Sequence, residues 1–147
     1  RLKHMRKLIW LLLLIVMVAF IFYNSSLPAV QSDGASRLLA SYIQGFANTL
    51  HIHLPTTNLN HDLRKLAHLF EFFMLGLILC NTYREFHVSR RAATGYIFFL
   101  SLAVAVVDEY IQLFSPGRSG MISDILLDFG GAFVGWLAYE VWQWCRH

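Results

Sequence analysis

Charged residues are scarce in this chain, and cysteine is scarcer still. Asp, Glu, Lys and Arg make up 14% of the residues, whereas hydrophobic residues make up 56%. Soluble domains typically contain about 25% charged and 45–50% apolar residues. The shortage of charge argues against a small soluble domain. The net charge of +3 does not indicate nucleic-acid binding either, because the basic residues lie beside apolar runs and not along a stripe.

The two cysteines, Cys80 and Cys145, form neither a CxxC pair nor a disulfide ladder. We therefore expect both to be free thiols. The length of 147 residues fits one domain. We take Met5 as the natural start, so that the domain covers residues 5–147 and residues 1–4 precede it.

Long apolar runs are the main feature of the sequence. A helix that crosses a bilayer requires about 20 apolar residues. The first run follows Arg6 and Lys7, as a signal peptide also would. Residues 24–28 offer no convincing cleavage site, so we favour an uncleaved membrane helix. The predicted spans are residues 7–23, 61–83, 92–114 and 121–144.

Between the first two spans, apolar residues recur at helical spacing over residues 34–50, and Ser32 or Asp33 can cap this stretch. The pattern predicts an amphipathic helix on the membrane surface, with a lid over a site as the alternative. His51 and His53 follow it and are weak evidence for a metal site. The predicted fold is an all-α integral membrane four-helix bundle with an amphipathic interfacial helix between helices one and two.

Basic residues predict the orientation. Arg6 and Lys7 precede the first span, and Arg84, Arg90 and Arg91 fill the connection after the second. If all four helices cross, both groups lie on one side, which the positive-inside rule makes cytoplasmic. The predicted protein is multi-pass, with both termini in the cytoplasm.

Polar residues gather at the outer ends of the last three spans. They are Arg64, Lys65, His68 and Glu71 on the second, Asp108, Glu109 and Gln112 on the third, Arg118 in the following turn, and Asp124 and Asp128 on the fourth. Ionisable residues inside a membrane commonly mark function, which predicts one outward-facing polar pocket. The alternative is that these charges only pair and set helix register. Gly131 and Gly135 share the stripe of Asp124 and Asp128 and predict a close helix approach.

Candidate roles follow from side-chain chemistry. We predict catalytic roles for His68, Asp108 and Glu109, with an acid as general base and the histidine as its proton partner. The predicted substrate-binding residues are Arg64, Lys65, Glu71, Gln112, Arg118, Asp124 and Asp128. Arginine suits bidentate contact with phosphate or carboxylate. No HExxH-type zinc pattern occurs, so no metal ligand is assigned, although the N and O donors leave a divalent cation open.

Two segments carry a resemblance to the VanZ-like family of bacterial membrane proteins. One is residues 64–72, and the other runs from Asp108-Glu109 through Gln112 and Pro116-Gly117-Arg118 to Asp124, Asp128 and Gly131. Phe72 stands where the family is expected to have tyrosine, which argues against an essential hydroxyl there.

The resemblance implies a bacterial plasma-membrane protein with a role in resistance to teicoplanin, a lipid-bearing glycopeptide. The implied partners are the lipid bilayer and a lipid-linked cell-wall precursor or the glycopeptide, with no nucleic acid. A small transporter or channel is one alternative, which the apolar residues 75–79, 97–100 and 133–136 disfavour. A structural membrane protein without chemistry is the other.

Overall fold

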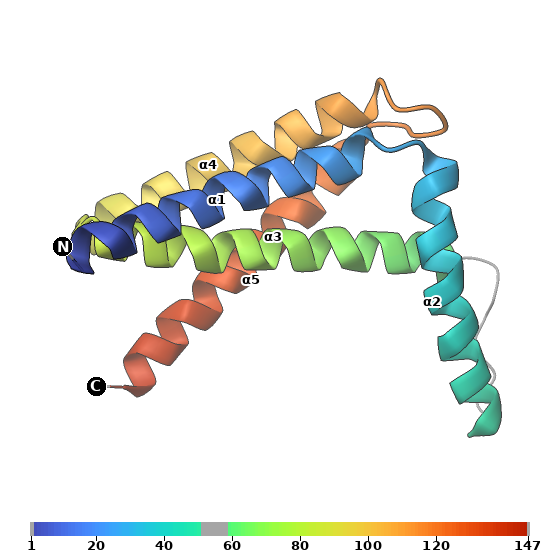
Figure 1. Ribbon diagram of the computed structural model, residues 1–147, viewed down its shortest axis with the longest axis horizontal. Helices are drawn as coiled ribbons and strands as arrows, with labels where there is room; N and C mark the ends of the chain where they lie inside the picture. The colour runs from blue at the N-terminus through green and yellow to red at the C-terminus, as the bar shows by residue number, and fades with distance from the viewer. Residues whose placement is uncertain (1, 51–58, 147) are drawn as a thin grey trace.

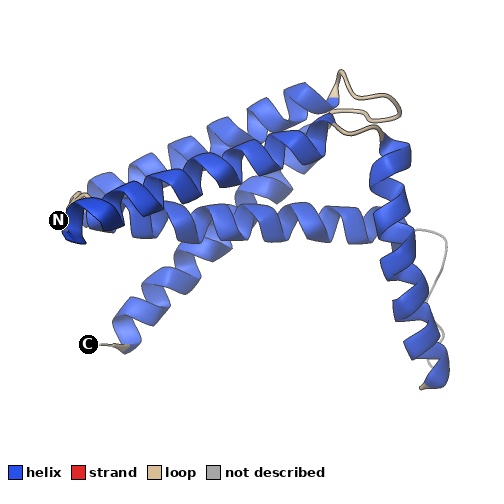
Figure 2. Ribbon diagram, viewed as in Figure 1, coloured by secondary structure: helices blue, strands red, loops and turns tan. Residues whose placement is uncertain are grey.

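The computed structural model describes residues 2–50 and 59–146, apart from the side chains of residues 29–33, 35, 36, 59 and 60. His51 and His53 lie outside the described residues. The described part is all-α, with turns and loops between its helices and no strand (Figure 2). The helices are α1 (Leu2–Ser26), α2 (Ala29–Thr49), α3 (Leu59–Glu85), α4 (Arg90–Gln112) and α5 (Ile122–Cys145).

Helix α3 is the centre of the fold and contacts each of the other four helices. Helices α1 and α4 run alongside it, whereas α5 crosses it obliquely and α2 stands at a steep angle at one end (Figure 1). The N-terminus lies at the end of the molecule where α3 finishes and α4 begins, as the Arg6–Glu85 ion pair confirms. The basic segments predicted to share one side therefore do lie together, while their cytoplasmic position stays a prediction.

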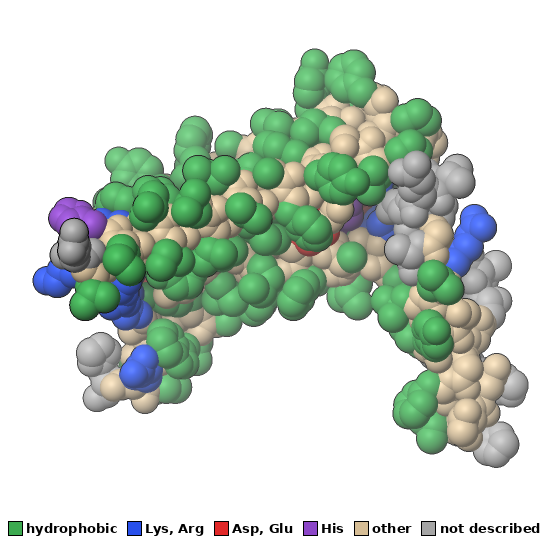
Figure 3. Space-filling model, in the orientation of Figure 1, with side chains coloured by type: hydrophobic (Ala, Val, Ile, Leu, Met, Phe, Trp, Pro, Cys, Tyr) green, Lys and Arg blue, Asp and Glu red, His purple; other side chains and the backbone are tan. Residues whose placement is uncertain are grey.

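Three helices, α1, α4 and α5, are long and apolar enough to cross a membrane. Helix α3 is long enough, but its first half carries Asp62, Arg64, Lys65 and Glu71. The prediction of four spans is thus supported for three of them and stays a prediction for α3. Figure 3 shows apolar side chains over the middle of the visible face and basic side chains towards its ends, as expected for a lipid-facing surface.

Helix α2 differs from its prediction in where it begins. It starts at Ala29 instead of residue 34, directly after Pro28. Proline disfavours helical geometry in the residue before it, which separates α1 from α2 at this point. Ser32 and Asp33 therefore lie within the helix and do not cap it.

The apolar side of α2 faces away from the bundle. Leu38, Tyr42 and Phe46 are 64%, 74% and 69% exposed, whereas the small residues Ala40 and Ala47 are buried. Helix α2 packs mainly on α3. A helix is present, as predicted, but its location at a membrane surface stays a prediction.

The core lies along the inner faces of α1, α3, α4 and α5. Ile21, Phe72, Leu75 and Ala105 are completely buried there, and Leu79 nearly so. Helix α4 ends at Gln112, two residues before the predicted Phe114, because Pro116 disfavours helix just ahead of it. The resulting turn returns the chain to α5 at the edge of the polar cluster.

Candidate functional site

The crossing of α3 and α5 positions the site. A Cβ added to Gly131 would lie 2.5 Å from the carbonyl oxygen of Leu69, and one added to Gly135 would meet the carbonyl oxygen of Phe73. On the other helix, a Cβ at Gly76 would meet the carbonyl oxygen of Ala132. The predicted close approach is therefore confirmed, with Gly76 as a third glycine that the sequence pattern did not identify.

Buried acids and one histidine meet next to this crossing. Asp108 is 0% and Asp128 2% exposed, although each carries a carboxyl group. His68 Nδ1 lies 3.7 Å from Glu71 Oε2 and 3.9 Å from Asp108 Oδ2. Three helices thus bring together residues that are separated by up to sixty positions in the chain, as the sequence predicted.

The end of α1 completes this cluster, which the sequence analysis missed. Asn24 Nδ2 donates a hydrogen bond to Glu71 Oε1 at 2.7 Å. Gln112 Nε2 donates to Asp108 Oδ2 at 3.0 Å and to Ser25 Oγ at 3.4 Å. The sequence did offer a signal for these residues. Asn24 and Ser25 directly follow the first apolar run, at the same outer end as the other polar residues.

Basic groups and the loop before α5 form the outer rim. Lys65 Nζ lies 3.0 Å from Asp124 Oδ1, and an Arg118 Nη donates to the carbonyl oxygen of Asn24 at 3.3 Å. Glu109 Oε2 accepts a hydrogen bond from the backbone N–H of Met121 at 2.9 Å. This contact secures the loop at the start of α5, so Glu109 has a structural role, and its catalytic role stays a prediction.

A pocket of about 90 Å³ opens between the cluster and the rim. Eight of the ten predicted site residues line it: Arg64, Lys65, His68, Glu109, Gln112, Arg118, Asp124 and Asp128. The other two, Glu71 and Asp108, lie behind that lining and within 3.9 Å of His68 Nδ1. The volume suits an ion or one small anionic group, since a water molecule takes about 30 Å³.

An apolar groove of about 580 Å³ lies beside the pocket. Its walls are Leu39, Leu63, Leu66, Ala67, Leu69, Phe70, Phe73, Gly131 and Val134. Along α3, residues 63, 66 and 67 face the groove, whereas residues 64, 65 and 68 face the pocket. This stretch of α3 therefore separates the polar pocket from the apolar groove.

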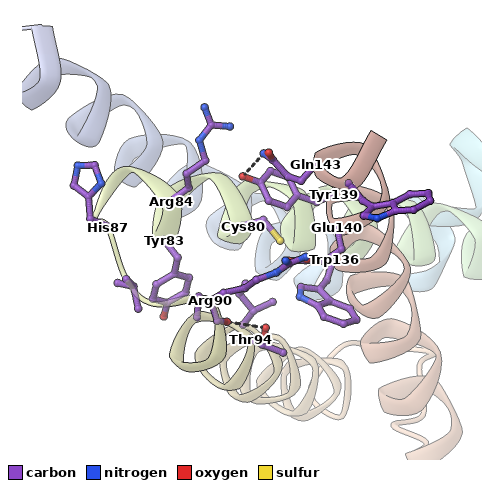
Figure 4. A pocket seen from close by; sticks show the side chains of 14 residues that line it. Cys80, Tyr83, Arg84, His87, Arg90, Thr94, Trp136, Tyr139, Glu140 and Gln143 are labelled. Atoms are coloured by element: carbon purple, nitrogen blue, oxygen red, sulfur yellow. Dashed lines mark hydrogen bonds and ion pairs between the residues drawn. The ribbon is translucent and has the colours of Figure 1, made fainter. Parts of the chain in front are cut away.

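A second polar pocket, of about 520 Å³, lies at the opposite end of α3, α4 and α5 and was not predicted. Figure 4 shows Tyr83, Arg90 and Tyr139 around it, one from each helix. Arg90 pairs with Glu140 across this pocket. The charges that face it are thus at least partly matched within its own walls, and its described lining contains no cluster of buried acids.

Comparison with known proteins agrees with the motifs. A model of the VanZ/LLP1 family matches residues 10–143, which is nearly the whole chain and includes every residue of the polar cluster. Searches of curated proteins and of solved structures give no match. The motif-based resemblance is thereby confirmed, and the chain belongs to the VanZ/LLP1 family.

Proposed function

We propose that the protein binds a lipid-linked anionic molecule of the bacterial envelope, with its head in the polar pocket and its apolar chain in the groove. The observation that carries this proposal is that pocket and groove adjoin across one stretch of α3. A molecule with a phosphate or carboxylate next to a hydrocarbon chain matches both cavities at once. In this proposal α3 also spans the membrane, both termini are cytoplasmic, and the pocket opens outward.

The side chains of the pocket suit this ligand. Lys65, Arg64 and Arg118 line it and can contact phosphate or carboxylate oxygens. Behind them, His68 Nδ1 lies 3.9 Å from Oδ2 of the buried Asp108, and these two groups could act together as acid and base. A bound group that must lose or gain a proton would meet this pair. Ligand binding would account for the basic residues of the rim. Chemical modification of the ligand would account for His68 and Asp108 behind them.

In the physiological form of the proposal, the protein lowers susceptibility to teicoplanin. It would do so by binding or modifying a lipid-linked cell-wall precursor or the glycopeptide itself. Membership of the VanZ/LLP1 family supports this form, because the resemblance implies that phenotype. Teicoplanin carries a lipid chain, so either molecule would offer a hydrocarbon tail to the groove.

The transporter alternative requires a polar path across the bundle. Phe72, Leu75 and Leu79 on α3 and Ala105 on α4 are buried together in the apolar core. This layer counts against such a path. The purely structural alternative is addressed by experiment, because it predicts that substitutions in the pocket change protein abundance and nothing else.

The physiological test is susceptibility to teicoplanin and vancomycin in a bacterium that lacks this protein. Cells would carry an empty vector, the wild type, His68→Ala, Asp108→Asn or the control Glu140→Gln, which removes an acid at the opposite end of α5. We expect protection by the wild type and the control but not by the two site variants, at equal membrane abundance. If protection against the antibiotics depended only on how much of each variant is present in the membrane, the structural alternative would be supported.

The biochemical test compares a polyprenyl phosphate with the corresponding uncharged polyprenol. Both would be added to purified protein in lipid nanodiscs, and binding would be followed by native mass spectrometry. We expect the phosphate to bind and the alcohol to bind much more weakly. We expect Lys65→Met to lower the preference for phosphate. Equal binding of the two molecules would contradict the proposed anion site.

A further inference from the structure

Three helices each contribute one side chain of a kind that commonly binds metal ions, and these side chains meet at one point. A donor atom from His68 on α3, one from Asp108 on α4 and one from Asp128 on α5 all lie within 4.8 Å of one another. Both aspartates are at least 98% buried. The set combines one imidazole nitrogen with two carboxylate oxygens, a combination that first-row divalent metals accept.

A separate observation concerns the hydrogen bonding of this cluster. Asp128 is 2% exposed and lines the polar pocket. Asp108 Oδ1 and His68 Nδ1 are buried without a hydrogen-bond partner in the described part of the chain. Buried polar groups normally have partners, because desolvation without compensation costs several kcal/mol.

We propose that His68, Asp108 and Asp128 bind a divalent transition-metal ion, such as Zn²⁺ or Mn²⁺. The inference rests on the proposed function, since the ion would lie at the inner wall of the pocket that receives the anionic head. His68 and Asp128 both line that pocket, so a further coordination position would face the ligand. There the ion would polarise a bound phosphate or carboxylate oxygen.

The surrounding geometry suits this assignment. Ligands of a tetrahedral ion with bonds of about 2.1 Å lie about 3.4 Å apart. His68 Nδ1 and Asp108 Oδ2 are 3.9 Å apart, and the three donors lie within 4.8 Å of one another, so side-chain rotations would bring them to the spacing that an ion requires. Gln112 Nε2 donates to Asp108 Oδ2 at 3.0 Å and orients this carboxylate, as outer-sphere groups do in metal sites.

The competing explanation is that the buried carboxyl groups are protonated and need no ion. The two explanations predict different variants. Without a metal, Asp128→Asn replaces a buried acid by a neutral isostere and stabilises the protein or leaves it unchanged. With a metal, the same substitution removes a ligand and abolishes the response to added ion.

The experiment uses full-length protein in detergent, stripped with a chelator and titrated separately with Zn²⁺, Mn²⁺ and Mg²⁺. Thermal unfolding would be recorded, and bound metal would be measured by mass spectrometry after gel filtration. We expect Zn²⁺ or Mn²⁺ to bind one per chain and to raise the Tm of the wild type. Glu140→Gln is the matched control, because Glu140 lies on the same helix at its opposite end and pairs with Arg90, away from this pocket. It should bind like the wild type, whereas Asp128→Asn should not.

His68→Gln provides a second variant in case Asp128→Asn does not fold, and it should also lose metal binding. A wild type that binds none of the three ions, or site variants that bind as well as the control, would overturn the inference. Polyprenyl phosphate binding would be measured on stripped and loaded protein. If polyprenyl phosphate binds but no metal does, only the proposed metal site is refuted. If metal binds but polyprenyl phosphate does not, only the proposed function is refuted.

Discussion

Two adjacent glycines in α5 should respond in opposite ways to alanine. A Cβ at Gly131 would lie 2.5 Å from the carbonyl oxygen of Leu69, whereas a Cβ at Gly130 meets nothing within 4 Å. Both substitutions place alanine in a helix interior, where it is favoured over glycine by about 1 kcal/mol. Any difference between the two variants therefore reports the contact between α3 and α5.

The size of the difference follows from that contact. The backbone carbonyl of Leu69 cannot rotate away as a flexible side chain would, so α3 and α5 must separate in Gly131→Ala. Overpacking of this kind costs about 1–3 kcal/mol. Gly130→Ala should be stabilised by up to about 1 kcal/mol, which is the propensity gain alone. Gly131→Ala should be less stable than Gly130→Ala by about 1–3 kcal/mol.

The assay is thermal unfolding of both variants and the wild type in one detergent, followed by circular dichroism. For a chain of this length, 1 kcal/mol corresponds to a change in Tm of about 2–4 °C. We expect a lower Tm for Gly131→Ala and an equal or higher Tm for Gly130→Ala. Equal Tm values for the two variants, or a higher value for Gly131→Ala, would refute the close crossing.

Three further predictions concern the site and its orientation. Gln112→Leu leaves Asp108 Oδ2 without its hydrogen-bond donor and should lower the unfolding free energy by about 1–3 kcal/mol, measured by thermal unfolding. Lys65→Met breaks a partly exposed pair with Asp124, so stability should change by less than about 1 kcal/mol while polyprenyl phosphate binding falls. Cys145 is exposed, and a membrane-impermeant maleimide should label it in inverted vesicles but not in intact cells. Labelling in intact cells would reverse the proposed orientation.

The apolar runs and the helical periodicity were sufficient to predict that the chain is helical and which polar residues lie close together, while the roles of these residues stay predictions. Three of the five described helices are long and apolar enough to cross a membrane, as their length and composition alone indicate. The polar residues of α3, α4 and α5 were expected to converge because each set lies on one face at one end of its helix. Seven of them line one pocket, together with Arg118 from the turn between α4 and α5.

Features that depend on how the helices pack against one another were not predictable from the sequence pattern. Asn24 and Ser25 join the site because α1 packs beside α3 and α4, which no local pattern specifies. The pocket at the opposite end exists because α5 diverges from α3 after the crossing, and a crossing angle depends on the packing of both helices. The start of α2 was misplaced because the restriction imposed by Pro28 outweighs the apolar pattern that begins later.

The α5 stripe of Asp124, Asp128, Gly131 and Gly135 links the stability of the fold to the geometry of the site. At 100° per residue these four positions fall within one narrow face of the helix. The glycines bring that face against the backbone of α3, and the same contact buries Asp128 beside His68. A rotation of α5 that relieved a bulky residue at Gly131 would move the carboxylate out of the cluster. A larger residue at Gly131 should therefore weaken metal binding as well as stability, whereas a change confined to the rim should weaken only the binding of the anionic ligand.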